Sequence, residues 1–287
     1  KTFTSFSCDE PDKKEKAERI MLKEKIEQIP ILDKNNHVID AVLWTDVFGK
    51  KKSASEKQTY TNPVIIMAGG KGTRLDPFTK ILPKPLIPIG EKPIIEIIME
   101  KFYKQGFQNF IFTLNYKKEY IKMFLRENSF PYKTDWVEED DYMGTAGGLS
   151  LLKDKINEPF FVLNCDIILN ADYTDIIKWH KENNNLVTLI GCHKEVKVPY
   201  GILELEDGIL KSFVEKPNYD VIINTGVYVL EPEIIGMIPD NKSINMNTLI
   251  EEVSRKGKVS VYPVHEGWID IGQWEEYKNG LKEIGDV

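Results

Sequence analysis

The stretch from Val64 to Pro85, VIIMAGGKGTRLDPFTKILPKP, decides how the rest of the chain is interpreted. Its β-branched start predicts a buried strand, and the glycines of GGKG predict a loop whose backbone can approach a ligand closely. Two cations follow. Arg74 carries a forked guanidinium that can hold phosphate oxygens in pairs, and Lys84 places a compact ammonium between two prolines. The stretch therefore predicts a strand that leads into a phosphate-binding loop.

Two common phosphate-binding motifs do not fit this loop. The third glycine of the dinucleotide fingerprint would fall on Leu75, and Walker A would need Lys and then Ser or Thr directly after Gly72. The glycines alone are equally consistent with a surface turn. The whole pattern, GGxGTRLxPxT followed by PKP, resembles the signature of the sugar-1-phosphate nucleotidyltransferases. The resemblance implies that the nucleotide is bound by Ala68, Gly69, Gly70, Gly72, Thr73 and Arg74.

Bulk composition is that of a globular protein. The chain has 287 residues, of which 41% are hydrophobic and 29% charged, and no apolar run approaches the ~18 to 20 residues of a membrane helix. A net charge of -7 argues against a nucleic-acid partner, because nucleic-acid-binding domains are usually basic. We therefore expect neither a membrane nor a nucleic acid as a partner.

The three cysteines, Cys8, Cys165 and Cys192, have no CxxC spacing, so neither a disulfide framework nor a zinc site is expected. Residues 1–20 are polar and do not resemble a signal peptide, which together with the cysteines favours the cytoplasm. Because the chain begins with Lys1 and not Met, we treat it as a candidate fragment of a longer product.

Residues 1–50 predict a small separate module. Residues 1–12 show no periodicity and are expected to be a loose or swapped arm, in which Phe3 and Phe6 can still pack. A helix (13–25), two strands (29–32 and 37–43) and a helix from Trp44 follow. This order resembles one CBS motif, a module that usually works in pairs and often binds adenine nucleotides. The family commonly has an Asp where Phe48 stands here, which argues against ribose binding. A regulatory or dimerising module, and hence a homodimer, and a structural appendage both remain open. Residues 51–62 are polar and predict a linker.

From residue 63 onward, strands and helices alternate. Apolar patterns predict a helix after Pro93, a strand at 107–114, a helix at 116–128 and a strand at 133–138. This order predicts a Rossmann-like, doubly wound α/β fold over residues 63–287, with a mixed, mainly parallel sheet. Ligands bind beyond the carboxyl ends of such strands, where the GGKG loop falls.

The GTAGGL segment at 144–149 predicts either a slot for a flat base or a helix start capped near Thr145. The family has a closely similar GTAGAL segment that binds the nucleobase. The resemblance implies that the base pocket is formed by Gly144, Thr145 and Gly147, with Glu138 as a further member.

Two aspartates suggest a metal site. Asp166 ends the apolar strand at 160–163, where an unpaired buried carboxylate would be unfavourable, although a helix N-terminus could also satisfy it. The resemblance makes Asp166 a magnesium ligand and assigns the same role to Asp270 of GWIDIG. Mg²⁺ prefers one or two carboxylates together with phosphate oxygens, so two aspartates from distant segments suit it.

A β-rich insertion between these aspartates predicts a sugar site. Asp207-Gly208 between two apolar runs predicts a hairpin. The acid and base of EKP are equally consistent with a surface ion pair, yet acids, bases and amides also suit sugar hydroxyls. The resemblance implies that the elements YG, EKP and NTG bind the sugar phosphate through Tyr200, Gly201, Glu215, Lys216, Asn224 and Thr225.

These residues together predict transfer of a nucleotidyl group from a nucleoside triphosphate to a sugar 1-phosphate, with Arg74, Lys84 and Asp166 as the catalytic residues. A CBS-like module joined to such a transferase resembles the bacterial guanylyltransferases that make GDP-glucosamine for legionaminic acid synthesis. The resemblance implies GTP and glucosamine 1-phosphate, with mannose 1-phosphate as the alternative. A catalytically inactive nucleotide sensor is the rival from another class.

Overall fold

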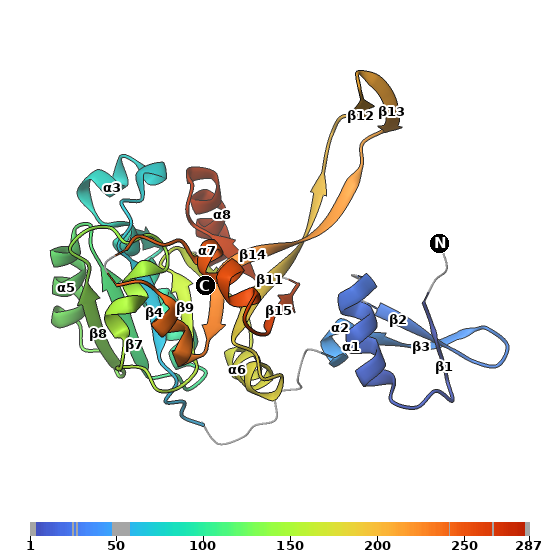
Figure 1. The fold of residues 1–287 in the computed structure, drawn as a ribbon, viewed down its shortest axis with the longest axis horizontal. Coiled ribbons are helices and arrows are strands. Elements are labelled where there is room, and N and C mark those ends of the chain that lie inside the picture. The colour runs from blue at the N-terminus through green and yellow to red at the C-terminus, as the bar shows by residue number, and fades with distance from the viewer. Residues whose placement is uncertain are drawn as a thin grey trace. The chain divides into compact units, whose positions relative to one another are not determined.

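The computed structural model describes residues 4–24, 26, 28–47, 58–240, 242–265 and 267–284. The chain divides into two units. The first contains Lys1–Glu56 together with Val196–Asp220, and the second contains Lys57–Glu195 together with Val221–Val287. Helices and strands of both units are labelled in Figure 1. Phe48 and residues 51–57 of the predicted linker lie outside the described residues.

The N-terminal part of the first unit is a three-stranded sheet with two helices. Its elements are β1 (Phe6–Ser7), α1 (Lys13–Glu24), β2 (Gln28–Leu32), β3 (Val38–Leu43) and α2 (Trp44–Val47), and the strand order is β1-β2-β3. Phe6, Ala17, Met21, Ile29 and Trp44 form its buried core. The predicted order of helix, strand, strand and helix is confirmed. The expected packing of Phe6 is confirmed, because this side chain is buried and β1 pairs in parallel with β2, whereas Phe3 lies outside the described residues. The CBS assignment stays a prediction.

The second part of the first unit is the hairpin of β12 (Ile202–Glu206) and β13 (Ile209–Val214). Asp207 and Gly208 both have positive φ, as the two-residue turn of a hairpin requires, so the predicted hairpin is confirmed. Leu203 pairs with Phe213 across the strands, and both side chains are more than half exposed.

A seven-stranded sheet forms the centre of the second unit. Its order is β15-β11-β14-β9-β4-β7-β8. The strands are β4 (Val64–Ala68), β7 (Asn109–Leu114), β8 (Lys133–Glu138), β9 (Phe160–Asn164), β11 (Val187–Lys197), β14 (Asn218–Leu230) and β15 (Val259–Val264). Neighbours pair in parallel at β4/β7, β4/β9, β7/β8 and β11/β15, whereas β14 runs antiparallel to β9. The predicted mixed, mainly parallel sheet is confirmed.

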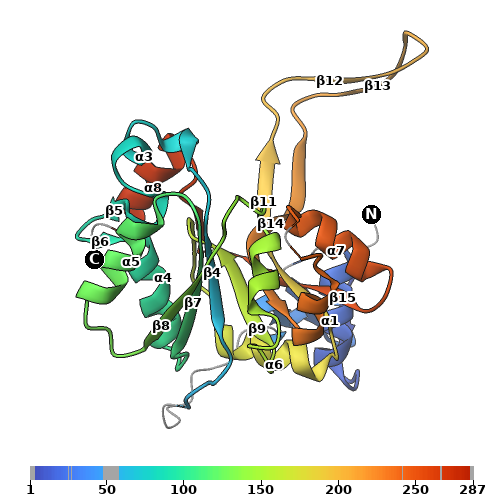
Figure 2. The same cartoon turned by 60° about the vertical axis from the view of Figure 1, so that its left-hand side comes forward.

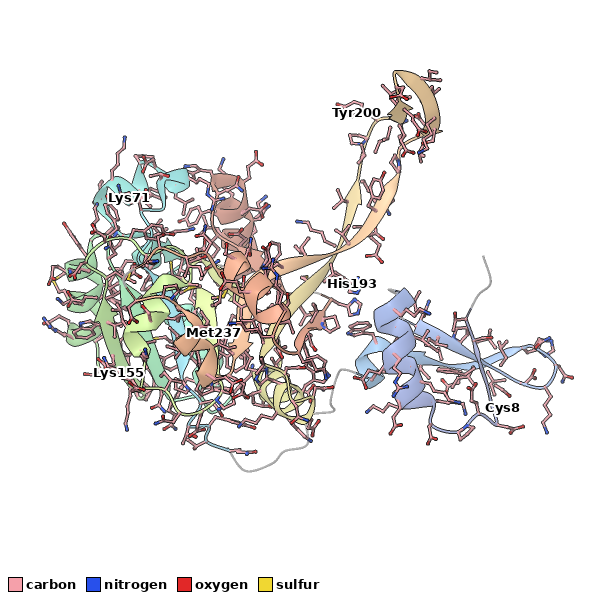
Figure 3. All side chains as sticks on the ribbon, in the orientation of Figure 1. Cys8, Lys71, Lys155, His193, Tyr200 and Met237 are labelled. Atoms are coloured by element: carbon pink, nitrogen blue, oxygen red, sulfur yellow. The ribbon has the colours of Figure 1, made fainter. Side chains whose placement is uncertain are left out.

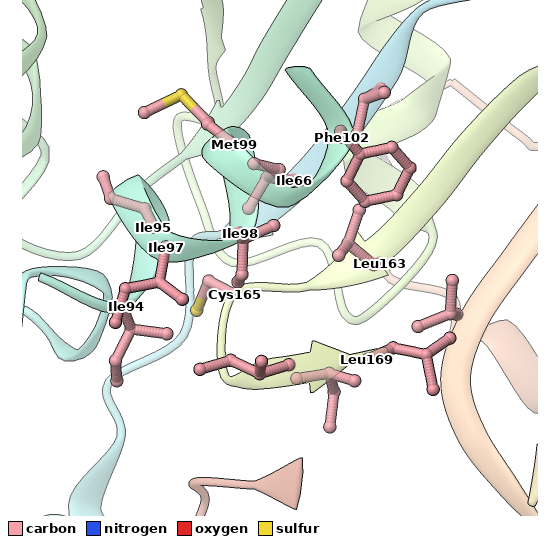
Figure 4. Close-up of a cluster of buried hydrophobic side chains, with 14 of the residues drawn as sticks. Ile66, Ile94, Ile95, Ile97, Ile98, Met99, Phe102, Leu163, Cys165 and Leu169 are labelled. Atoms are coloured by element: carbon pink, nitrogen blue, oxygen red, sulfur yellow. The ribbon is translucent and has the colours of Figure 1, made fainter. Parts of the chain in front are cut away.

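Helices cover both faces of this sheet, with α4 and α7 on opposite sides of β4 (Figure 2). Side chains of β4 alternate between two cores, since Val64 and Ile66 belong to one and Ile65 to the other. The first core also contains residues of α4 (Ile94–Tyr103), α5 (Lys118–Glu127), α6 (Tyr173–Glu182) and α8 (Trp274–Ile284), and the second contains residues of α7 (Met246–Ser254). Figure 4 shows part of the first core, with the isoleucines and Phe102 of α4 beside Ile66 of β4 and Leu163 of β9.

Short elements connect these layers. They are α3 (Phe78–Ile81), the 3₁₀ turns Thr73–Leu75, Lys84–Leu86, Gly147–Leu152 and Pro232–Met237, and the paired strands β5 (Pro88–Ile89) with β6 (Lys92–Pro93) and β10 (Ile167–Leu169) with β16 (Trp268–Asp270). Sequence analysis left α6 and β11 unassigned. In the described part of the chain, none of the helices has the length and apolar content that crossing a membrane requires.

Candidate active site

A cavity of about 600 Å³ opens at the carboxyl end of β4, where the GGKG loop begins. Seven of the residues predicted to bind the nucleotide line it: Gly69, Gly70, Gly72, Thr73, Arg74, Gly144 and Thr145. Lys84 and Asp166 line the same cavity. Ala68 is buried in β4 just before the loop. The structure therefore brings both predicted cations and the first aspartate to one cavity.

Gly72 lets Lys84 approach the loop. Its φ is +65°, a conformation that side chains rarely adopt, and a Cβ here would lie 2.9 Å from the Cβ of Lys84. Lys84 is buried, and its ammonium bonds the carboxylate of Asp166. A buried ammonium is unfavourable unless an anion compensates it, and Asp166 provides that anion in the cavity wall.

Asp166 and Asp270 meet because β10 and β16 pair in antiparallel register, with Ile167 opposite Asp270. The carboxylate of Asp270 accepts a hydrogen bond from the Gly272 amide at 2.7 Å, and a Cβ on Gly272 would lie 3.2 Å from Asp166 Oδ2. Burial and, to a lesser degree, the negative charge of Asp166 raise the pKa of Asp270. Two neighbouring carboxylates suit a divalent cation, which prefers oxygen ligands.

The segment after Asp270 also fixes the loop that carries the cations. Trp274 donates its indole N–H to the Asp76 carbonyl at 2.9 Å, and its ring lies 4.8 Å from that of Phe78. From the other side, Lys117 donates to three carbonyls at the end of α3, those of Thr79, Lys80 and Ile81, at 2.7–3.2 Å. The loop that leads to Lys84 is thus held at both ends by distant segments.

A second acidic side chain lines this cavity beside Asp166, that of Glu139, and no sequence motif predicted it. Glu139 is buried, and its carboxylate accepts the Met143 amide at 3.0 Å. Burial raises its pKa. The predicted Glu138 points elsewhere, since it bonds Lys118 at 2.8 Å and Lys122 at 2.9 Å on the surface and does not line either cavity. Alternation along β8 explains the difference, because successive side chains face opposite sides.

The glycines of GTAGG have no side chains, so the backbone of residues 242–244 can pack directly against them. A Cβ on Gly144 would lie 2.5 Å from the Ile244 carbonyl, and one on Gly147 would lie 2.6 Å from the Lys242 carbonyl. The amides of Ala146 and Gly147 both donate to the Ile244 carbonyl, at 3.0 and 3.3 Å. Thr145 accepts the amide of Met246, at the start of α7, at 2.9 Å. The predicted role of Gly147 in the base pocket is not supported by its position, because it lines neither cavity.

A second cavity, of about 380 Å³, shares Thr145 and Asn164 with the first. It is lined by Thr145, Asn164, Ile167, Asn224, Thr225, Gly226, Tyr228, Asn245, Met246, Asn247, Trp268 and Asp270. The predicted residues Asn224 and Thr225 are here, and Asp270 adjoins them. The indole of Trp268 donates to the Thr225 carbonyl at 3.1 Å and so fixes the NTG segment of β14. The carboxamides of Asn245 and Asn247 were not predicted, because no motif marks them.

The remaining predicted sugar residues lie on or beside the hairpin. Tyr200, labelled in Figure 3, is 74% exposed. Glu215 and Lys216 are both exposed and approach within 3.8 Å, which is a surface ion pair of little energetic weight. Gly201 contacts the same segment, since a Cβ there would lie 2.9 Å from Glu215 Oε2. These four residues are not among those that line the two cavities, and their sugar-binding role stays a prediction.

Within the described ranges, no group of three or more His, Cys, Asp or Glu side chains is placed to hold a metal ion. The pair Asp166 and Asp270 would therefore need ligand oxygens from a substrate to complete a coordination shell, which is the usual situation for Mg²⁺ at phosphate sites.

Comparisons with known proteins agree with this geometry. The family model of nucleotidyl transferases matches residues 63–286. A mannose-1-phosphate guanyltransferase of Yarrowia lipolytica is 33% identical over 226 residues, covering 75% of this chain and 62% of that protein. The chain thus spans less than two thirds of the length of the curated relatives that it matches.

Solved structures show the same relationship. HddC from Yersinia pseudotuberculosis has a TM-score of 0.62 and 30% identity, covering 78% of this chain and 99% of HddC. The same protein in complex with GMP-PN gives 29% identity and the same TM-score and coverage.

Proposed function

The chain belongs to the nucleotidyl transferase family, and from this premise we propose that it transfers the nucleotidyl group of a nucleoside triphosphate to a sugar 1-phosphate, releasing pyrophosphate. One observation carries the proposal: two cavities share the wall of Thr145 and Asn164, with Asp166 in one and Asp270 in the other. A triphosphate in the larger cavity and a sugar phosphate in the smaller one would meet at the aspartates.

The chemistry needs no covalent intermediate. A phosphate oxygen of the sugar attacks the α-phosphorus in line, the bond to the bridging oxygen breaks, and pyrophosphate leaves. Arg74 would hold the leaving phosphates, and Lys84 would neutralise charge that develops near Asp166. Asp166 and Asp270 would hold Mg²⁺, which supplies charge neutralisation to the phosphates when bound.

We propose that the base is guanine, because the buried carboxylate of Glu139 can accept hydrogen bonds from it. A buried carboxylate needs donors to offset its desolvation, and beyond the Met143 amide it retains acceptor capacity toward the cavity. Guanine presents two adjacent donors, N1–H and the N2 amine, which match one carboxylate. Adenine has no such pair. The names of the relatives, guanyltransferases, point the same way.

A Glu139→Gln variant tests this assignment. We expect kcat/KM for GTP to fall roughly 10- to 100-fold, because hydrogen bonds to a charged group contribute about 1.5–3 kcal/mol. We also expect the preference for GTP over ITP, which lacks the N2 amine, to shrink in the variant. Glu138→Gln tests the competing sequence-based assignment and should leave both quantities near wild type. A Glu138 variant that loses the preference, beside a Glu139 variant that keeps it, would reverse the assignment.

For the sugar we propose glucosamine 1-phosphate, on the resemblance of the N-terminal module joined to this fold, with mannose 1-phosphate supported by the names of the relatives. A screen of the four common nucleoside triphosphates against a panel of sugar 1-phosphates, scored by pyrophosphate release, tests the proposed function. Turnover with GTP and one hexose 1-phosphate is expected. A raised melting temperature with GTP but no turnover with any sugar phosphate would instead identify a nucleotide sensor.

A further inference from the structure

The smaller cavity contains two carboxamides that none of the family motifs includes. Asn245 precedes the first residue of α7, and Asn247 lies in the first turn of that helix. Both residues are exposed at the cavity. Neither carboxamide has a hydrogen-bond partner among the residues that the structure describes. Each can therefore donate and accept toward a ligand without breaking an existing bond.

The side chain of Asn224, in the NTG motif, already has hydrogen-bond partners in the protein. Its amide group donates to the Tyr228 hydroxyl at 2.9 Å, and its oxygen accepts the Gly226 amide at 3.1 Å. Both polar atoms of this side chain thus already have protein partners. Asn224 thus shapes the NTG segment of β14, whereas the carboxamides of Asn245 and Asn247 add hydrogen-bonding capacity to that of Asn164 in the same cavity.

The segment that carries the two asparagines is held in place by its backbone. Ile244 exchanges hydrogen bonds with the GTAGG segment through both its carbonyl and its amide, the latter donating to Met143 at 3.0 Å. The side chain of Asn245 makes no capping bond to α7, whose first amide is taken by Thr145. Truncating either asparagine therefore removes no interaction that holds the segment.

We propose that Asn245 and Asn247 bind the ring hydroxyls of the sugar 1-phosphate and determine which sugar is accepted. This inference rests on the proposed function. A carboxamide donates and accepts at once, as a sugar hydroxyl does, so it distinguishes sugars by the direction of their hydroxyls. Asp270 is the one charged side chain among the residues that line this cavity, and it would be engaged at the phosphate. Discrimination among sugars then falls to neutral groups.

The test is steady-state kinetics of Asn245→Ala and Asn247→Ala with GTP and the sugar 1-phosphate that wild type uses best. We expect KM for the sugar phosphate to rise roughly 3- to 10-fold in each variant, because a lost hydrogen bond costs about 0.5–1.5 kcal/mol, whereas KM for GTP stays within about twofold. Thr248→Ala is the matched control, since Thr248 is exposed in the same turn and does not line the cavity. A merely structural role would raise both KM values and lower the melting temperature.

The relative kcat/KM for glucosamine 1-phosphate and mannose 1-phosphate gives a second readout. Asn245→Asp or Asn247→Asp should shift this ratio toward glucosamine 1-phosphate, because a carboxylate accepts from the ammonium but cannot donate to a hydroxyl. An unchanged sugar KM in both alanine variants, with an unchanged ratio in both aspartate variants, overturns the inference and leaves the proposed function standing.

Absence of turnover in wild type would count against the proposed function, and calorimetric binding of the same two sugar phosphates would then decide the inference. Weaker binding to the alanine variants than to wild type supports it. No binding to wild type, or equal binding to all three proteins, overturns it.

Discussion

The two cavities are built in different ways. The larger one is lined by residues within 67–74, 84, 113–115, 139–145 and 164–166, and several of its side chains are charged, among them Arg74, Lys84 and Asp166. The smaller one is lined by residues within 145, 164–167, 224–228, 245–247 and 268–270, and its polar groups are neutral except for Asp270. Charges act over several ångströms and tolerate few substitutes, whereas neutral hydrogen bonds act only in contact. Under the proposed function, the larger cavity would perform the reaction and the smaller one would select the acceptor.

The strongest test of this division is Asp166→Asn. The substitution removes the partner of Lys84 and one of the two carboxylates at the boundary of the cavities. We expect the rate of pyrophosphate release to fall ~10²- to 10³-fold, the usual effect of deleting a preorganised charge contact. Asp154→Asn is the control, because Asp154 is exposed, lines neither cavity and has a positive φ that Asn tolerates. Wild-type turnover in the Asp166 variant would contradict this assignment of different roles to the two cavities.

Gly144→Ala tests whether the wall between the cavities is one structure. The new Cβ would meet the Ile244 carbonyl at a φ of +78°, so the segment 242–247 must move. We expect the free energy of unfolding to fall by about 1–3 kcal/mol and KM to rise for both substrates. Urea denaturation and steady-state kinetics measure the two effects. Gly236→Ala, where the Cβ meets nothing within 4 Å, should leave both unchanged. Loss of affinity for one substrate only would show two independent walls.

The smallest expected effect concerns the contact between α6 and β11. His180 is fully buried, contacts Thr188 at 2.8 Å and Glu231 at 3.2 Å, and burial lowers its pKa to about 4. Between about pH 6.5 and 4 the unfolded chain therefore binds more protons than the folded one, so stability is lost as the pH falls through this window. Burial raises the pKa of Glu231, which works in the opposite sense.

We expect the free energy of unfolding to be about 1–2 kcal/mol lower at pH 5 than at pH 7 through this pair. In the His180→Gln variant the free energy of unfolding should depend less on pH. This expectation holds whatever the stability of the variant at pH 7. Urea midpoints of wild type and variant at the two pH values measure it. If the variant keeps the full pH dependence of the free energy of unfolding, that dependence arises from other titratable groups.

The sequence predicted those features that depend on contiguous residues. The loop after β4, the helix after Pro93, the hairpin turn at Asp207-Gly208 and the parallel sheet follow from periodicity, glycine placement and charge, and the structure confirms them. The two aspartates came from a resemblance, and the register of β10 with β16 brings them together.

Features that depend on which segments meet in space could not be predicted in this way. Glu139 was missed because the choice between it and Glu138 depends on which face of β8 points to the cavity, a one-residue difference in register. Asn245 and Asn247 were missed because their position follows from the contact of Ile244 with GTAGG. β11 was missed because its second half reads as a polar segment.

The attachment of residues 242–246 to GTAGG leaves the side chains at positions 245 and 247 free to change during evolution. Most of the bonds that hold the segment run between backbone atoms, so they survive almost any change of side chain at positions 245 and 247. If Asn245 and Asn247 select the sugar as proposed, substrate preference can change by point mutation at two positions while the catalytic loop stays the same. A library randomised at these two codons is the natural starting point for redirecting the protein to new acceptors.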